Sequence, residues 1–138
     1  VVPLIELLRS EDRSSRLAAV TFDDAYLGAV SQGVDLCLQE GAPCTVFVSP
    51  HLLGKFPAWD RNADAGKWSV SEREAFLWKD RGLSEPAELE ADSNPCRIAT
   101  VDELALVAAR PGVAIGNHTM RHANLGSLAF GEACEELG

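Results

Sequence analysis

The sequence lacks long apolar runs and is poor in positive charge. None of its hydrophobic stretches approaches the ~18–20 residues needed to cross a bilayer, and its opening Val-Val-Pro-Leu-Ile-Glu lacks the basic start of a signal peptide. We therefore expect no membrane segment, and the sequence assigns no compartment. Twelve Lys and Arg residues stand against 21 Asp and Glu residues, which gives a formal charge of -9. This acidic balance repels phosphate backbones and argues against nucleic acid as a partner.

The four cysteines also lack the paired Cys-x-x-Cys spacing of a structural zinc site, and a domain of this size does not require disulfides. Cys37 and Cys134 fall on the apolar stripes of predicted helices, and Cys44 opens an apolar strand. We interpret the cysteines mainly as core thiols, which behave as small hydrophobic groups. Their use does not define a redox compartment.

Internal repeats and low-complexity tracts are absent as well. The composition, with 46% hydrophobic and 24% charged residues, is that of an ordinary globular protein. At about 100–200 residues per domain, the 138 residues predict a single domain over 1–138.

The hydrophobic pattern predicts an α/β fold. Residues 17–22 form an apolar run interrupted only by Thr21, which is typical of a strand buried on both faces of a parallel sheet. The apolar residues Val30, Val34, Cys37 and Leu38 recur at helical spacing and predict an amphipathic helix over 28–40, ended by Gly41. Residues 44–48 form a second apolar strand. Strand, helix and strand within about thirty residues indicate a right-handed βαβ unit.

The strand and helix pattern is interrupted at about 51–97 by a long irregular segment, called here the excursion, and then resumes. Excursions of such length are usually functional or mobile. The excursion contains all three tryptophans: Trp59, Trp68 and Trp78. For at least two of them, we favour anchoring of the segment to the body of the protein over stacking on a ligand. Three predicted elements follow it: a helix with a Thr100–Glu103 capping box that buries Leu104, Val107 and Ala108, a strand at 113–115, and a closing helix with Phe130, Cys134 and Leu137 on its apolar stripe.

Polar residues follow two of the predicted strands. Asp23 and Asp24 come after the first strand, and His118 and His122 come after the third. The carboxyl ends of parallel strands are where ligands and catalytic groups gather. Two imidazoles and one carboxylate supply three metal ligands and leave positions open for water and substrate. The two histidines project to the same side if their segment is helical, so the pattern predicts a divalent metal site.

These motifs resemble those of a known family. Residues 21–24, Thr-Phe-Asp-Asp, are similar to a TFDDG motif in which Ala25 replaces the usual glycine, and residues 118–122, His-Thr-Met-Arg-His, are similar to an H[ST]xxH motif. Residues 41–48 are similar to the strand that follows the first helix in the same family, and residues 113–117 are similar to the segment that leads into its histidines. The family is that of the polysaccharide deacetylases, with the NodB homology domain, also called carbohydrate esterase family 4.

The resemblance implies a partial or distorted (β/α) barrel and a metal-dependent hydrolase that removes N- or O-acetyl groups from an acetylated carbohydrate. It implies that Asp23 is the general base and that Asp24, His118 and His122 hold a divalent metal. Zn²⁺ is the metal most common in the family, and Co²⁺, Mn²⁺ or Ni²⁺ are compatible. The resemblance does not name substrate-binding residues in this chain.

The later motifs of the family would lie after Gly138, so we expect the chain to be the amino-terminal half of the domain. Such a half would leave a strand edge and an apolar face uncovered, which favours self-association. Two other functions stay open. One is a catalytically inert fragment that binds metal or sugar. The other is a non-haem iron oxygenase with two histidines and a carboxylate, although those enzymes are typically built on all-β folds.

Overall fold

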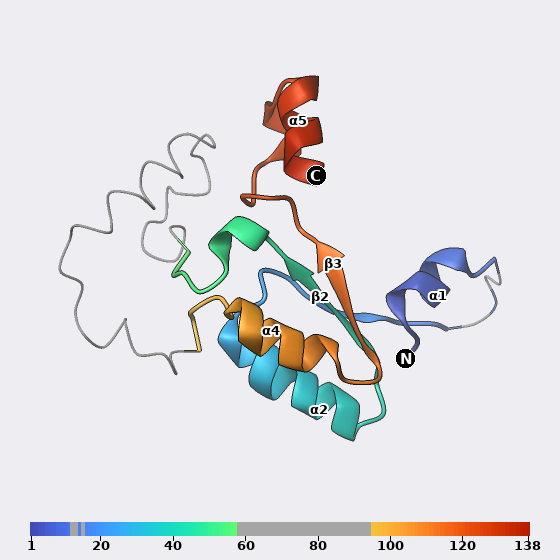
Figure 1. Cartoon of the computed structure of the whole chain (residues 1–138). Helices are drawn as coiled ribbons and strands as arrows, with labels where there is room; N and C mark the ends of the chain where they lie inside the picture. The colour runs from blue at the N-terminus through green and yellow to red at the C-terminus, as the bar shows by residue number, and fades with distance from the viewer. Residues whose placement is uncertain (12–13, 15, 58–94) are drawn as a thin grey trace.

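Three parallel strands form the sheet of this protein. The computed structural model describes residues 1–11, 14, 16–57 and 95–138 (Figure 1). The strands are β1 (Val20–Phe22), β2 (Cys44–Val48) and β3 (Val113–Asn117), in the order β1-β2-β3. In register, Val20 lies beside Cys44, and Cys44 lies beside Val113. The predicted α/β class is confirmed, and the carboxyl ends of the strands share one edge of the sheet.

The first strand is shorter and more exposed than predicted. The apolar run at 17–22 pairs only over Val20–Phe22, and Thr21 is exposed, so the prediction of a strand buried on both faces is wrong. β1 has only β2 as a neighbour among the described strands, whereas β2 is central. Its central position explains why β2 contributes all of the buried residues of the three strands: Cys44, Thr45, Val46 and Val48.

The predicted helix at 28–40 is present but begins with a wider turn. A π-helical stretch, η1 (Ala29–Gly33), continues into α2 (Val34–Gln39). Val30 and Val34 are buried in the core as their spacing predicts. A Cβ on Gly33 would lie 3.0 Å from the ring of Phe22, so the glycine allows the helix to approach β1 closely. Figure 1 shows α2 beside the later helix α4 (Val101–Ala108).

The predicted capping box begins α4. The Thr100 hydroxyl accepts from the Glu103 N–H at 3.3 Å, and the Glu103 carboxylate accepts from the Thr100 N–H at 2.7 Å. Leu104 and Val107 pack in the core as predicted, but Ala108 is exposed. That part of the predicted stripe is wrong, since Val107 is the buried residue of α4.

An ion pair links this helix start to the chain before it. Arg97 is 5% exposed, and its two terminal nitrogens donate to the Glu103 carboxylate at 2.8 and 3.0 Å. The Arg97 guanidinium lowers the pKa of Glu103 from 4.5 to about 2. The ionised carboxylate therefore stabilises the fold above its unfolded-state pKa, and this stabilisation is lost as the pH falls toward the folded-state pKa.

We expect the Arg97–Glu103 pair to make the free energy of unfolding depend on pH in the acidic range. The advantage of the wild type over Glu103→Gln in urea denaturation midpoint should be largest at about pH 6 and should shrink steadily toward about pH 2.5. Gln keeps an acceptor for the capping box, so the comparison isolates the charge. Circular dichroism at a series of pH values measures the midpoints, and a difference independent of pH would contradict the assignment.

The closing helix is where the predicted burial fails. α5 (Phe130–Leu137) forms as predicted, but Phe130 is 86% exposed, Leu137 is 54% exposed and Cys134 is exposed. Glu136 is the buried residue of this helix. Figure 1 shows why: α5 lies beyond the carboxyl end of β3 and does not lie on the sheet.

Two of the four cysteines lie in the core and two are exposed. Cys44 is buried in β2, and burial raises the pKa of its thiol, which suits an unreactive core position. Cys37 packs against the same core, so both are core thiols as predicted. Cys134 and Cys96 are exposed, and the prediction of a core position for Cys134 is wrong because α5 does not cover the sheet.

The remaining described elements are short. A helix that the sequence pattern did not predict, α1 (Leu4–Arg9), lies near the amino terminus, and 3-10 turns occur at η2 (Pro50–Leu52) and η6 (Leu125–Ser127). No helix in the described ranges is both long and apolar enough to span a membrane. Most of the predicted excursion, including all three tryptophans, lies outside the described residues. At its end, Ile98 is fully buried and bridges to Tyr26.

Candidate metal centre

Three of the predicted site residues meet at the carboxyl edge of the sheet. Asp24 follows β1, and His118 comes directly after β3, with His122 four residues later. One ligand atom from each residue lies within 4.8 Å of those of the other two. The Nε2 atoms of His122 and His118 lie 3.1 and 3.6 Å from the same oxygen, Oδ1 of Asp24. The structure therefore brings the predicted ligands together around one point.

The Oδ1 atom of Asp24 is the clearest sign that a cation fits here. It is buried and makes no hydrogen bond to the described residues. Burying a carboxylate oxygen without a hydrogen bond is costly, and a cation between this oxygen and the two nearby imidazole nitrogens would offset that cost. One carboxylate oxygen and two imidazole nitrogens form a donor set that suits Zn²⁺ and related transition metals. The residues present thus fit a divalent metal.

The backbone after β1 separates the two adjacent aspartates. Asp24 and Ala25 both adopt left-handed conformations, with φ of 65° and 56°. Asp24 is half-buried among the histidines, whereas Asp23 is exposed and is not part of the cluster. Ala25 is fully buried at the position where the family motif has glycine. The left-handed backbone at this position costs glycine no strain, whereas alanine adopts it at a cost on the order of 1–3 kcal/mol.

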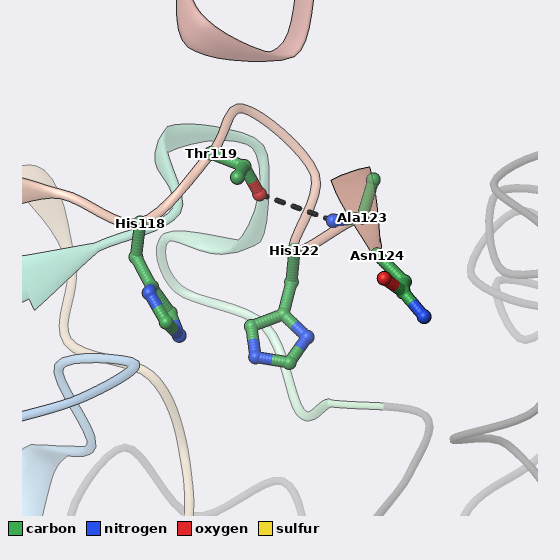
Figure 2. A pocket seen from close by; sticks show the side chains of 5 residues that line it. All are labelled: His118, Thr119, His122, Ala123 and Asn124. Atoms are coloured by element: carbon green, nitrogen blue, oxygen red, sulfur yellow. Dashed lines mark hydrogen bonds between the residues drawn. The ribbon is translucent and has the colours of Figure 1, made fainter. Parts of the chain in front are cut away.

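The histidines approach one another through a loop and not through a helix. Thr119 and His122 have φ of 64° and 60°, so the helical alternative considered for residues 118–122 is wrong. The two imidazole rings meet edge to face with centroids 4.9 Å apart. The Thr119 hydroxyl accepts from the Ala123 N–H at 3.0 Å, which closes the loop locally (Figure 2).

The segment after β2 supports this loop from one side. The Ser49 hydroxyl donates to the His118 carbonyl at 2.8 Å, and Ser49 is 1% exposed. The His51 N–H donates to the Met120 carbonyl at 3.0 Å, while the His51 side chain is exposed. Sequence reasoning missed Ser49 as a supporting residue. The available signal was its place directly after β2, at the same edge as the two motifs.

A cavity of about 190 Å³ opens beside the histidines. Figure 2 shows the residues that line it: His118, Thr119, His122, Ala123 and Asn124. The volume has room for several water molecules, each of which occupies ~30 Å³ in the liquid. Water and a small group of a substrate therefore have access to the imidazoles.

Comparison with protein-family models matches residues 10–137 to the polysaccharide deacetylases. The chain belongs to the polysaccharide deacetylase family. The predicted resemblance to this family is thereby confirmed, and the match covers all three strands of the sheet. No curated protein and no solved structure matches the chain significantly.

In this polysaccharide deacetylase chain, one of the three residues between the histidines, Arg121, has a buried partner. Arg121 donates to the carboxylate of Glu136 at 2.8 Å, and Glu136 is 1% exposed. The sequence does not predict this pairing, because glutamates on a short surface helix are usually solvated. Burial of Glu136 depends on where α5 lies relative to the histidine loop, and the pattern of α5 carries no signal of it.

Proposed function

We propose that this chain provides the metal-binding and proton-accepting part of a carbohydrate deacetylase that removes N- or O-acetyl groups. Asp24, His118 and His122 hold the divalent metal, with Zn²⁺ as the favoured ion, and Asp23 is the general base. The observation that carries the proposal is the convergence of the Nε2 atoms of His118 and His122 on Oδ1 of Asp24. This oxygen is buried and makes no hydrogen bond to the described residues. The convergence occurs in a chain that belongs to a deacetylase family.

The residues divide the chemistry among them. A bound divalent cation lowers the pKa of its water toward ~7 and polarises an acetyl carbonyl. As metal ligands, the neutral imidazoles and the ionised Asp24 carboxylate would direct lone pairs at the cation, so another group has to accept the proton of the water. Asp23 is adjacent in sequence and exposed, which leaves its carboxylate free to accept the proton of the attacking water. Acetate leaves, and the sugar keeps an amine or a hydroxyl.

We further propose that the sheet belongs to a partial or distorted (β/α) barrel. Its three strands are parallel, and their spatial order is their order in the chain, β1-β2-β3. Sequential parallel strands joined by helices are the repeating unit of such barrels. The catalytic residues of barrels lie at the carboxyl ends of the strands, as the proposed site does.

Acetate release from acetylated carbohydrates tests the proposal. We expect the full-length protein, stripped of metal, to release no acetate from N-acetylglucosamine oligomers or an O-acetylated glycan and to regain activity when Zn²⁺ is added back. The variant with His118→Ala and His122→Ala, treated in the same way, should stay inactive. A zinc-loaded protein that releases acetate from neither substrate would contradict the deacetylase function and favour an inert metal- or sugar-binding protein.

A further inference from the structure

Glu136 is a buried carboxylate that faces the loop of the metal ligands. It lies on α5 and is 1% exposed. Its Oε1 accepts from the Arg121 guanidinium at 2.8 Å, and its Oε2 accepts from the Arg121 backbone N–H at 2.9 Å. The Glu136 carbonyl also accepts from the Met120 N–H at 2.8 Å. Residue 136 thus binds both residues at the middle of the loop.

The loop that Glu136 binds has a strained backbone. Thr119 and His122 adopt left-handed φ values on either side of Met120 and Arg121. Non-glycine residues persist in this region only where the surrounding structure holds them there. One of the two strained residues, His122, is itself a proposed metal ligand. The position of its imidazole therefore depends on the contacts that hold the loop.

These contacts come from two directions. On the side of β2, Ser49 and His51 bind the carbonyls of His118 and Met120. On the side of α5, Glu136 binds the N–H groups of Met120 and Arg121 and the Arg121 side chain. A carboxylate that accepts both a backbone N–H and a guanidinium forms strong, charge-assisted hydrogen bonds. Removing one partner of a buried ion pair leaves the other uncompensated, so changes at Glu136 should disturb the loop.

We infer that Glu136 is a positioning residue: its carboxylate holds Arg121 and its backbone carbonyl holds Met120, so that His118 and His122 converge on Asp24. The inference rests on the proposed function, because the convergence matters for catalysis only if the three residues bind a metal. Glu136 is not among the clustered ligand atoms, so it acts through the loop and not on the ion. Hydrogen-bonding partners that orient ligands typically change metal affinity 10–100-fold when removed.

Titration of the metal-free chain with Co²⁺, followed by its visible absorption bands, tests the inference. Glu136→Gln keeps the size of the side chain but loses the charge and one acceptor. We expect its Kd for Co²⁺ to rise about 10–100-fold, with bands of altered shape and intensity. Glu135→Gln is the matched control, because Glu135 is exposed on the same helix, and it should titrate as the wild type does. A contact that only stabilises α5 would lower Tm without changing the bands of the folded protein.

Amide hydrogen exchange of the metal-free protein separates this inference from the proposed function. In Glu136→Gln, the amides of residues 118–123 should exchange faster, and those of β2 should not. If the wild type binds no Co²⁺, the proposed metal site fails, and faster exchange in the loop still supports the positioning role. Wild-type exchange of the loop in Glu136→Gln would overturn the inference, as would an unchanged Co²⁺ affinity and spectrum in a wild type that binds the metal.

A second variant covers the case in which Glu136→Gln does not fold. Arg121→Gln removes the guanidinium and keeps the Glu136 carboxylate as acceptor for the backbone N–H. We expect it to weaken Co²⁺ binding and to speed loop exchange in the same direction, by a smaller factor. Wild-type behaviour of a folded Arg121→Gln variant in both measurements would overturn the inference.

Discussion

Asp23→Asn should lower acetate release from N-acetylglucosamine oligomers by ~10²–10⁴-fold, the usual contribution of a general base. The substitution keeps the size of the side chain and removes the proton acceptor. Asp23 is exposed and lies outside the ligand cluster, so zinc affinity should change little. Steady-state acetate assays on the zinc-loaded, full-length protein give the rate, and calorimetry gives the affinity.

Asp24→Asn is the matched control, because it makes the same change at the adjacent residue. It replaces an ionised ligand with a weaker, neutral one, so metal affinity and rate should fall together, and excess Zn²⁺ should restore part of the rate. If Asp23→Asn lost the metal and Asp24→Asn kept it, the two roles would be reversed. If neither variant changed acetate release, the deacetylase function would be wrong.

Replacing both His118 and His122 with alanine should weaken zinc binding by more than about 100-fold. Loss of a partner that merely orients a ligand already costs 10–100-fold, and this variant loses two of the three ligands themselves. Elemental analysis of the purified protein and calorimetry of the metal-free protein measure the effect. The affinity should also fall as the pH is lowered, because imidazoles must be neutral to bind the metal.

His51→Ala is the control for that variant, because His51 is the one other histidine of the chain and its backbone contacts the same loop. Its side chain is exposed, and its contact with Met120 uses only the backbone N–H, which alanine keeps. We expect wild-type zinc affinity for this variant. Equal affinities in all three proteins would exclude the proposed metal centre.

Burial was predicted well near the sheet and poorly at the end of the chain. Val30, Val34 and Val107 were correctly assigned to the core, because each belongs to a helix that packs on the sheet. Cys134 and Phe130 carry the same kind of pattern and are exposed. An apolar stripe indicates that a helix has a preferred face, but what lies against that face depends on the position of the whole helix.

The sequence by itself determined the α/β class, the strand at 44–48, the helix start at Thr100 and the residues of the candidate metal centre. These features depend on interactions between neighbours in the chain, such as apolar spacing, capping by Glu103 and short motifs. Only the tertiary structure decided how the centre is assembled. The left-handed turns at Asp24 and His122 bring side chains that are far apart in the sequence around one point, and Glu136 is buried against Arg121 of the preceding loop. Such backbone conformations and buried charges are stable only when contacts with other parts of the fold hold them in place. The pattern of neighbouring residues does not predict those contacts.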